Sequence, residues 1–521
     1  MNRARRRDEL YESRLFFQPG RIESKQRDLR KIAVIGVTLI VCVLAAPRLN
    51  AEKPTLEHIH PVAVAPGTTN ELKLSGKFEP WPPKIWSSAP GLEFAFGTNK
   101  NAVQVTVAPE AKPGPALLRA YNSDGTSEPV IFVVNNGVVL PDAEPNNEFA
   151  NPQSLTNFPA TVAGRLDKNS DVDSYGLRVK AGQWIDARVE SHTLMSEVDA
   201  VLRLTTADGY QVAWNHDFAS FDPRLVWRAS HDEQLVLQVF GFKYPADAQI
   251  QLSGGSGAIY LLKLALSDEP PADLSVPMNE QSELHELPVE LHGAICPAGD
   301  EDAYSLEMTK DERIEVRVVA SEFGSPLDPW IALRDEKGKQ LARNDDAEGS
   351  RDPVLEWKAP SGGKFSIIVG SLTHQGEEDW RYRLHISKAA PDYHSTVTAS
   401  SLVMEPNSTN ELKISTRRLG DFEGELVLTV RDLPEGVEAE PVKVDAKAKD
   451  ATLKLVSKDA PPFNGPIKIL ATNPATDEEK AAQFELVSRS QNNGVPGGYS
   501  TLLVERTADI WLTVKEKPAS K

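Results

Sequence analysis

The stretch that decides the fold runs from Asp142 to Tyr175, and both of its ends are acidic. It opens with Asp142-Ala-Glu144-Pro145-Asn146-Asn147 and closes with Gly164-Arg-Leu-Asp-Lys-Asn-Ser-Asp171-Val-Asp173-Ser-Tyr175. The apolar run Leu155-Thr-Asn-Phe158-Pro-Ala-Thr-Val162 lies between them. Apolar runs of this length between Pro, Asn and Gly are typical of strands joined by turns.

The second half of this stretch occurs twice in the chain. At a constant offset of 129 positions, eight residues find an identical partner, and one inserted residue later Asp222 and Trp227 find Asp352 and Trp357. The eight pairs are Gly164/Gly293, Asp171/Asp300, Asp173/Asp302, Tyr175/Tyr304, Asp199/Asp328, Gly209/Gly338, Asn215/Asn344 and Asp217/Asp346. Self-similarity at a fixed spacing predicts a duplicated domain.

These markers resemble the bacterial pre-peptidase C-terminal domain. The resemblance rests on the E-P-N-N motif at 144–147, the D-x-D-x-Y motif at 171–175, and a later series of Ala181-Gly182-Gln183, Asp199, Leu202, Leu204, Asp208-Gly209, Asn215 and Asp217. It covers residues 142–267 well and 280–387 more loosely. It implies small, jelly-roll-like antiparallel β-sandwiches of the kind appended to secreted proteases and envelope proteins.

The flanking regions have the alternating apolar pattern of strands with turn residues between them. Residues 52–139 resemble TIG-type immunoglobulin-like domains, and residues 392–515 resemble the Ig-like sandwiches of bacterial surface proteins. We therefore expect an all-β chain of tandem antiparallel sandwiches after an N-terminal apolar helix. Its predicted segments are a leader (1–51), an Ig-like domain (52–139), two repeats (140–267 and 280–388) with a linker between them (268–279), and a second Ig-like domain (392–515).

The N-terminus has the pattern of an export signal. A basic region precedes the uncharged run at 32–46, which is shorter than the roughly 20 residues that span a bilayer as a helix. This pattern predicts a signal peptide cleaved after Ala51, and an uncleaved signal anchor is the alternative. Either way, the rest of the chain is expected outside the cytoplasm: in the periplasm, on the cell surface or in the medium. Membrane contact is expected only through this run.

The charge of the chain is unevenly distributed. The net charge is −18 overall, but residues 1–51 carry +6, which leaves −24 on the remainder. An acidic body repels nucleic acid, so no nucleic-acid partner is expected. The two cysteines, Cys42 and Cys296, offer no disulfide to a chain cleaved after Ala51.

The acidic ends predict a calcium site in the first repeat. Ca²⁺ takes about six to eight oxygen ligands, and alternate side chains of an extended chain project to one face. Asp142, Glu144 and Asn146 alternate in this way, as do Asp171 and Asp173. The resemblance extends to the collagen-binding domains of bacterial collagenases, where a similar acidic segment binds Ca²⁺. It implies Glu144, Asn146, Asn147, Asp171 and Asp173 as ligands, with Asp142 in place of a Glu.

The same side chains could instead cap turns, because Asp and Asn beside Pro and Gly often bond nearby backbone amides. In the second repeat the corresponding segment, Met278–Glu283, lacks E-P-N-N, so Asp300 and Asp302 have no predicted partners. Asn215, Asp217 and Asp222 form a further acidic group, and β-turn chemistry is the simpler interpretation of it. Trp81 and Trp86, in Trp-Pro-Pro-Lys-Ile-Trp, are candidates for exposed ligand contacts.

No catalytic arrangement emerges from the sequence. Ser256 lies in Gly-Gly-Ser-Gly-Ala, which breaks the G-x-S-x-G pattern, and H-E-x-x-H and P-loop motifs are absent. Cys296 is expected to be a small buried hydrophobe on a strand. We therefore expect a non-catalytic binding or adhesion protein that recognises an extracellular polysaccharide or an envelope protein. The alternatives are a structural spacer or coat subunit and, less favoured, a hydrolase with an unfamiliar site.

Overall fold

The structure is a computed structural model that describes residues 52–218, 221–245, 251–272, 283–321, 324–347, 350–488 and 503–517. The predicted leader, with its apolar helix at 32–46, lies outside these residues, as does the predicted linker from residue 273 onward. The described chain is built almost entirely of strands, so the all-β prediction is confirmed. No helix among these residues is long and apolar enough to cross a membrane.

The N-terminal sandwich has two sheets, ordered β1-β3-β6-β5 and β2-β9-β7-β4, with β8 added beside β7. Its core includes Leu72, Val105, Leu118 and Phe132. The strands are β1 (Thr55–His60), β2 (Ala63–Val64), β3 (Thr69–Lys77), β4 (Lys84–Ser87), β5 (Leu92–Phe96), β6 (Ala102–Val107), β7 (Gly114–Asn122), β8 (Gly125–Thr126) and β9 (Val130–Val134).

The first repeat also has two sheets, ordered β10-β12-β19-β14-β17 and β11-β13-β18-β15-β16. Its core is formed by alternate residues of each strand, such as Leu202 and Leu204 on β15 or Leu235 and Leu237 on β18. The elements are β10 (Val139–Pro141), β11 (Gln153–Ser154), β12 (Ala160–Arg165), β13 (Asp173–Val179), β14 (Trp184–Glu190), the 3₁₀ helix η1 (His192–Leu194), β15 (Val198–Thr206), β16 (Gln211–Asn215), β17 (Arg224–Arg228), β18 (Glu233–Lys243) and β19 (Ile259–Ser267).

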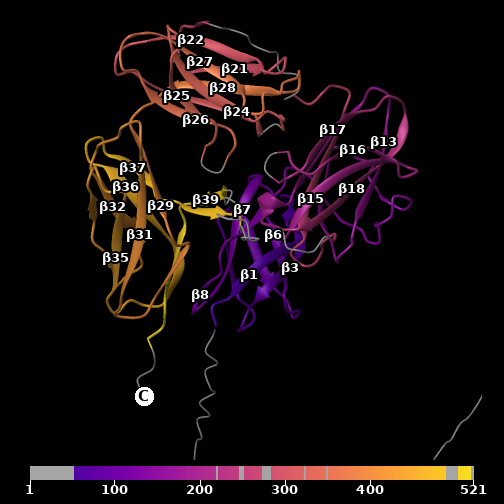
Figure 1. The fold of residues 1–521 in the computed structure, drawn as a ribbon. Helices are drawn as coiled ribbons and strands as arrows, with labels where there is room; N and C mark the ends of the chain where they lie inside the picture. The colour runs from indigo at the N-terminus through magenta and orange to yellow at the C-terminus, as the bar shows by residue number, and fades with distance from the viewer. Residues whose placement is uncertain are drawn as a thin grey trace, which may run out of the picture. The chain divides into compact units, whose positions relative to one another are not determined.

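The second repeat has the same strand order, β20-β22-β27-β24-β25 facing β21-β28-β23-β26, and its two layers are visible in Figure 1. Each strand of this repeat corresponds to one in the first repeat. Only β10 of the first repeat has no counterpart among the described residues of the second. The strands are β20 (Glu283–Leu284), β21 (Val289–Ala294), β22 (Glu301–Met308), β23 (Arg313–Val319), β24 (Pro329–Asp335), β25 (Gln340–Asn344), β26 (Val354–Lys358), β27 (Gly363–Ser371) and β28 (Arg381–Lys388).

The C-terminal sandwich packs the sheet β29-β31-β35-β33 against β30-β40-β36-β32-β34, with β37 beside β36 and a separate pair β38-β39. The core includes Leu412, Leu428, Ile469 and Leu512. The strands are β29 (Asp392–Val397), β30 (Ser401–Met404), β31 (Thr409–Leu419), β32 (Leu426–Arg431), β33 (Val437–Ala439), β34 (Val442–Val444), β35 (Asp450–Ser457), β36 (Phe463–Asn473), β37 (Glu478–Ala481), β38 (Phe484–Val487), β39 (Leu503–Thr507) and β40 (Ile510–Val514).

The sheets are not purely antiparallel, which differs from the prediction. The pairs β2/β9, β10/β12, β11/β13, β20/β22 and β30/β40 are parallel. In the first repeat the reason lies in the connectivity: after β10 the chain crosses to the other sheet to form β11, and it returns to the first sheet for β12. Residues 142–152, which join β10 to β11, are called the crossing segment below.

Candidate metal centre

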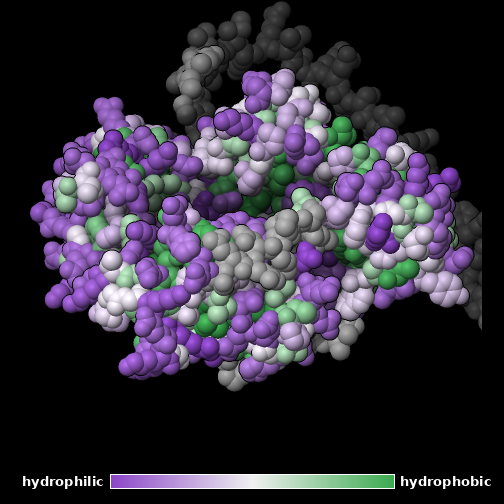
Figure 2. Space-filling model, turned by 90° about the horizontal axis from the view of Figure 1, so that it is seen from above, coloured by the Kyte–Doolittle hydropathy of each residue, from purple (hydrophilic) through white to green (hydrophobic). Residues whose placement is uncertain are grey.

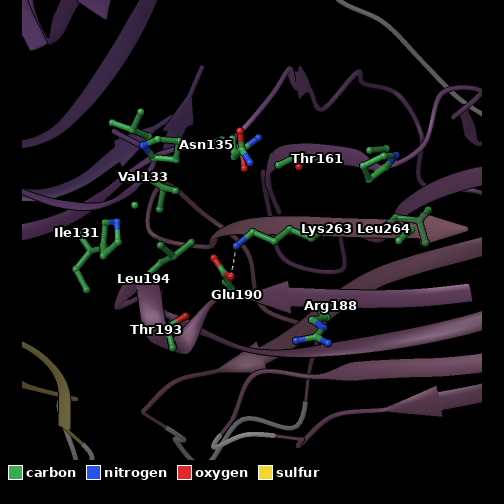
Figure 3. A pocket seen from close by; sticks show the side chains of 18 of the residues that line it. Ile131, Val133, Asn135, Thr161, Arg188, Glu190, Thr193, Leu194, Lys263 and Leu264 are labelled. Atoms are coloured by element: carbon green, nitrogen blue, oxygen red, sulfur yellow. Dashed lines mark hydrogen bonds and ion pairs between the residues drawn. The ribbon is translucent and has the colours of Figure 1, made fainter. Parts of the chain in front are cut away.

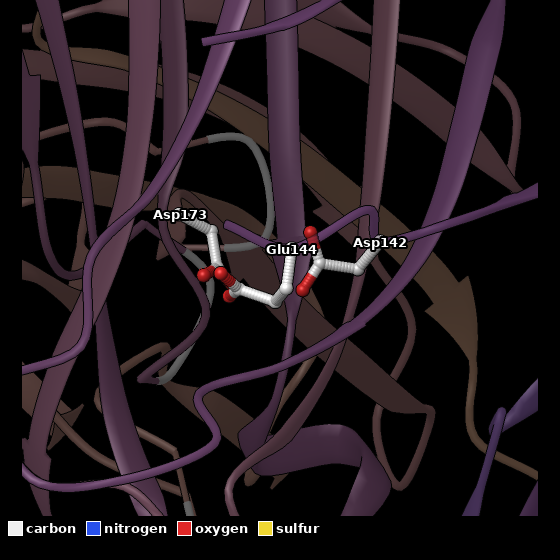
Figure 4. Close-up of side chains that lie close together, drawn as sticks. All are labelled: Asp142, Glu144 and Asp173. Carbon is white, nitrogen blue, oxygen red and sulfur yellow. The ribbon is translucent and has the colours of Figure 1, made fainter. Parts of the chain in front are cut away.

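Three carboxylates converge at one end of the first repeat. Asp142 and Glu144 lie on the crossing segment, and Asp173 begins β13 after the turn that follows β12. One ligand oxygen from each lies within 4.8 Å of the others, and Figure 4 shows the three side chains pointing toward one another. Among the described residues, no other group of three or more His, Cys, Asp or Glu side chains lies close enough together to hold an ion.

Two buried oxygen atoms at this place lack hydrogen-bond partners. Asp173 is 0% exposed, and its Oδ2 accepts a hydrogen bond of 2.5 Å from the Tyr260 hydroxyl, whereas its Oδ1 has no partner. Asn146, which is 1% exposed, likewise leaves its Oδ1 without one. Buried polar atoms normally have a partner, so these two oxygens are free to take a ligand.

Two tyrosines support the carboxylates from inside the sandwich. The Tyr175 hydroxyl donates to Asp142 Oδ1 at 2.8 Å and lies 2.6 Å from the Tyr260 hydroxyl, which donates to Asp173 Oδ2, so the two tyrosines lie in contact between Asp142 and Asp173. Asn146 Nδ2 also donates to Asp142 Oδ1, at 2.7 Å. Both tyrosines are fully buried, which raises the pKa of each well above its ordinary value and keeps the hydroxyls protonated as donors.

The carboxylates cannot all be ionised without a counter-charge. Burial, and then the negative charge of Asp142, raises the pKa of Asp173 to about 10. Burial also raises the pKa of Asp142 and that of Glu144. Without a cation, Asp173 therefore holds its proton at neutral pH, and a divalent ion would replace that proton by supplying the opposite charge.

The donor set fits calcium. All the converging atoms are oxygens, which hard cations prefer, and two oxygens held at about 2.3–2.6 Å from one Ca²⁺ are at most about 5 Å apart. The three oxygens lie within 4.8 Å of one another, which satisfies this limit. Asp142, Glu144 and Asp173 would hold the ion, with Asn146 Oδ1 as a fourth donor from the protein.

Two of the six predicted ligands, Asn147 and Asp171, are hydrogen-bonded to each other and do not face the other carboxylates. Asn147 Nδ2 donates to Asp171 Oδ1, and the Asp167 backbone N–H donates to Asp171 Oδ2 at 2.6 Å. Asp171 therefore closes the turn before β13 and fastens the crossing segment to it. The structure brings Asp142, Glu144, Asn146 and Asp173 together and places Asp171 and Asn147 beside them as support.

The second repeat keeps the tyrosine framework, and its described residues form no carboxylate cluster there. Tyr382 donates to Asp302 Oδ2 at 2.5 Å, and its hydroxyl lies 2.6 Å from that of Tyr304. These three residues correspond to Tyr260, Asp173 and Tyr175. The Tyr–Tyr–Asp triad is therefore a feature of the fold, to which the first repeat adds Asp142 and Glu144.

The paired glycines explain how the triad fits. Gly164 lies opposite Tyr260 in the ladder, and a Cβ there would come within 2.1 Å of the ring. Gly293 stands in the same relation to Tyr382, at 2.4 Å. Sequence reasoning noted both glycines but missed both tyrosines. The signal that could have found them is a duplicated glycine that must face a bulky side chain.

The further acidic group forms turns, as the simpler interpretation held. Asp222 accepts the backbone N–H groups of Ser191, His192 and Thr193 at 2.7–3.1 Å. Asp352 does the same in the second repeat for Ala320 and Ser321, at 3.0–3.1 Å. These buried carboxylates fix the chain after β14 and after β23, and they are saturated by these donors.

The two predicted ligand-contact tryptophans are half-buried rather than exposed. Trp81 packs edge-on against Phe78 and Phe96, with ring centroids 6.0 and 5.2 Å away. Trp86 packs edge-on against Trp511 of the C-terminal sandwich, at 5.7 Å. Both rings pack against other aromatic side chains. The ligand-contact prediction required exposed rings, and these rings are not exposed.

Cys296 is exposed, although the sequence predicted a buried strand residue. The strand β21 ends at Ala294, and the chain turns outward there. The prediction of a buried strand residue was wrong because the apolar run before Cys296 extends no further than Ile295, which is buried.

A cavity of about 800 Å³ lies on the outer face of the β12-β19-β14 sheet. Its apolar wall includes Ile131 and Val133, and its floor carries the Lys263–Glu190 ion pair (Figure 3). Arg188, also in the floor, lies 3.3 Å from Asp186. Its described lining contains no Ser, Cys, His or aromatic side chain. Its charges largely compensate one another, so the carboxylate cluster is the stronger candidate site.

Comparison with known proteins gives partial likenesses. No protein-family model matches the chain. A stretch of 73 residues is 38% identical to part of a "probable subtilase-type serine protease" from Deinococcus radiodurans, and it spans 14% of this chain and 10% of that protein.

Two solved structures are similar to parts of the chain. One is the pre-peptidase C-terminal domain of a Bacillus anthracis collagenase: 15% identity, 22% of this chain, 99% of that one, TM-score 0.17. The other holds an M60 catalytic domain with two CBM51 domains from Clostridium perfringens: 11% identity, 65% and 46% coverage, TM-score 0.17.

Proposed function

We propose that this chain is an exported, non-catalytic binding protein whose first repeat is stabilised by Ca²⁺. The observation that carries the calcium assignment is the pair of orphaned buried oxygens, on Asp173 and Asn146, beside two further carboxylates. An ion there would fasten the crossing segment to the start of β13 and so join the two sheets at this end. Export is proposed from the basic leader and the apolar run at 32–46.

The binding role is supported by the architecture. The described residues form sandwiches whose faces and loops are available for recognition, and the saturated turns at Asp222 and Asp352 leave no free acid–base pair there. The proposed target is a polysaccharide or protein outside the cytoplasm. The 73-residue similarity to part of a probable subtilase-type serine protease fits a module that accompanies other domains.

The test is thermal unfolding of the full chain in millimolar Ca²⁺ and in chelator. A ligand at 100 times its Kd adds about 2.7 kcal/mol of stability, which should raise the Tm of the first repeat by several degrees. Glu144→Gln and Asp173→Asn should abolish the shift, because each removes a negatively charged donor.

Asp302→Asn is the matched control, because Asp302 occupies the place of Asp173 in the second repeat but has no E-P-N-N segment in its sequence context. This variant should respond to Ca²⁺ like the parent chain. A parent chain without a calcium shift, or a shift that persists in both Glu144→Gln and Asp173→Asn, would disprove the proposed site.

A further inference from the structure

The second repeat presents a group of cationic side chains on the outer face of one sheet. Successive residues of a strand point to opposite faces, and the inward residues of β21, β23 and β28 belong to the hydrophobic core. The residues between them therefore point outward. Five of these can carry positive charge and are called the cationic face below: His292 on β21, Arg317 on β23, and Arg381, Arg383 and His385 on β28.

The strand register places these side chains next to one another. His292 lies directly across from Arg383 in the ladder of β21 and β28, and Arg317 lies directly across from His385 in that of β23 and β28. Residues opposed in this way have Cβ atoms about 4.5–5.5 Å apart, and like charges in such a pair destabilise a sheet. The cations of both pairs repel each other whenever the histidines are protonated, and a bound anion would offset that repulsion.

Two carboxylates on the same face balance this charge only in part. Glu290 Oε1 lies 3.5 Å from His292 Nε2 and 3.7 Å from Arg383 Nε, and Glu315 Oε1 lies 3.4 Å from Arg317 Nη2. The side chains of Arg383 and Arg317 are 38% and 50% exposed, and ion pairs exposed in this way are weak. Three arginines and two histidines thus face two glutamates, and the guanidinium groups of Arg317 and Arg383 are accessible to a ligand.

Neighbouring segments limit the cationic face at both ends. At one end of β23, Arg313 forms an ion pair with Asp421 of the C-terminal sandwich. At the opposite end of the sheet, Arg381 Nε donates to the backbone oxygen of Glu378 at 3.3 Å, in a turn with three acidic residues at 377–379. An anionic ligand would therefore lie over the middle of the face.

The first repeat uses the matching surface differently. Three of its apolar residues occupy ladder positions that are cationic in the second repeat: Ala163 in place of His292, Ile259 in place of Arg381 and Leu261 in place of Arg383. These apolar residues pack in one cluster with Ile131 and Leu117 of the N-terminal sandwich. The same face is an apolar interface in one copy and a charged surface in the other, so the second copy suits a partner that carries negative charge.

We propose that the cationic face binds an anionic polysaccharide, one whose sugar units carry carboxylate or sulfate groups. This inference rests on the proposed function and names its ligand. The guanidinium groups of Arg317 and Arg383 can each form two parallel hydrogen bonds to a carboxylate, and the two histidines add further donors. A polymer repeats its anionic group along the chain, so several weak contacts act together.

Size and charge disfavour other anionic partners. A protein interface takes about 20–30 residues on each side, whereas the cationic face and its two glutamates make seven. Recognition of an anionic membrane takes clusters of about 4–8 Lys or Arg. The net charge of −18 opposes a membrane or a nucleic acid, which would lie against much of the chain. A single polysaccharide strand contacts the cationic face alone, and salt screens charges more than about 8–10 Å away.

The test is binding of the full chain to immobilised polymers, measured by biolayer interferometry in chelator so that Ca²⁺ cannot bridge carboxylates. Polygalacturonate supplies carboxylates and dextran sulfate supplies sulfates, while dextran is the neutral probe. Poly-glutamate and phosphatidylglycerol vesicles represent acidic protein and membrane. We expect binding to at least one anionic polysaccharide, none to dextran, and a rise in Kd as salt is added, because salt screens the ion pairs.

The double variant Arg317→Gln, Arg383→Gln should weaken binding about tenfold or more, because each change removes a charge-assisted contact. Arg317→Gln alone, at the more exposed site, should weaken it in the same direction and guards against a folding defect. Arg188→Gln is the matched control, since Arg188 holds the place of Arg317 on β14 of the first repeat and lies 3.3 Å from Asp186; its binding should be unchanged.

Binding to neither anionic polysaccharide, equal binding to dextran, binding to poly-glutamate or vesicles alone, or a Kd that the double variant leaves unchanged would overturn this inference. Binding to dextran alone would overturn the anionic ligand and leave the proposed binding function standing. The calcium-induced Tm shift should persist in every variant. Lost polysaccharide binding with that shift retained contradicts the ligand, whereas a parent chain without the shift contradicts the calcium site.

Discussion

Asp173 shows how one residue can serve the fold and a ligand at once. Its Oδ2 belongs to the hydrogen-bonded triad that both repeats share, while its Oδ1 faces the other carboxylates without a partner. Burial raises its pKa to about 10, so the metal-free side chain is neutral at pH 7. In the proposed calcium site this residue would exchange its proton for a share of the cation.

Proton release should accompany calcium binding. At pH 7 each bound ion should displace about one proton, because coordination requires the ionised carboxylate. Titration calorimetry in buffers of different ionisation enthalpy measures this number, and affinity should fall as the pH is lowered. Binding without any proton release would show that Asp173 is already ionised in the metal-free protein.

The same pKa fixes the sign of a stability effect. Because the folded pKa of Asp173 lies above the unfolded value of 3.8, the stability it contributes is fully present below pH 3.8 and is lost as the pH rises toward 10. Asp173→Asn should therefore stabilise the metal-free protein at pH 7 to 9, by up to a few kcal/mol. Urea unfolding in chelator measures this, and a less stable variant at pH 9 would contradict the argument.

At the scale of strands, the paired glycines set the close contact between β12 and β19 and between β21 and β28. Each glycine faces a tyrosine whose ring leans across it, and this contact directs the hydroxyl to the aspartate of the next sheet. The glycine, the tyrosine and the aspartate lie on three different strands in each repeat. The triad thus connects the two layers at one end of each sandwich.

Gly164→Ala should destabilise the first repeat by about 3 kcal/mol or more, because overpacking a filled core costs about 1–3 kcal/mol and the ring here is within 2.1 Å of the new atom. Gly293→Ala should have the same effect on the second repeat. Gly338→Ala separates this cause from backbone strain, because Gly338 has a φ of +76° but no atom near its Cβ. Calorimetry that finds Gly164→Ala no worse than Gly338→Ala would refute the packing argument.

The sequence predicted the strands and the acidic ends because both depend on local pattern. The duplication followed from spacing, whereas the metal-ligand prediction combined the alternation of Asp142 and Glu144 and of Asp171 and Asp173 with the family resemblance, and it wrongly included Asn147 and Asp171 among the converging residues. Tyr260 and Tyr382 escaped notice because they lie 122 positions apart rather than 129, so they fall out of register with the other pairs. Trp86 was misjudged because its partner, Trp511, is remote in the chain. Contacts between distant segments leave no local periodicity to detect.

At the scale of the whole molecule, residues 50–521 form one compact unit. Arg119 of β7 is 1% exposed and donates to the backbone oxygen of Ser400 at 3.0 Å and to that of Ser127 at 2.9 Å. Ser400 in turn donates to Glu128 at 2.5 Å. Burial lowers the pKa of Arg119 to about 10, which still leaves it charged at neutral pH. The N-terminal and C-terminal sandwiches therefore share a buried polar contact. The face drawn in Figure 2 is largely hydrophilic, with apolar residues mainly in its central hollow and in small groups elsewhere on it.

Arg119→Met should lower the stability of this contact by about 1–3 kcal/mol, because it leaves the buried backbone oxygens of Ser400 and Ser127 without their donor. Calorimetry should show the N-terminal and C-terminal sandwiches unfolding at lower temperature while the second repeat is unchanged. Arg343→Met, at an exposed site on β25, is the control. Equal effects of the two substitutions would show that the contact between the sandwiches adds little.

The duplicated Tyr–Tyr–Asp triad has an evolutionary consequence. The second repeat keeps the three residues without the E-P-N-N sequence, so a sandwich of this kind closes without that sequence. Selection can therefore alter the crossing segment of one copy while the shared interior of the fold is kept. New specificities could arise in such a lineage through loop exchange alone, with the interior inherited intact.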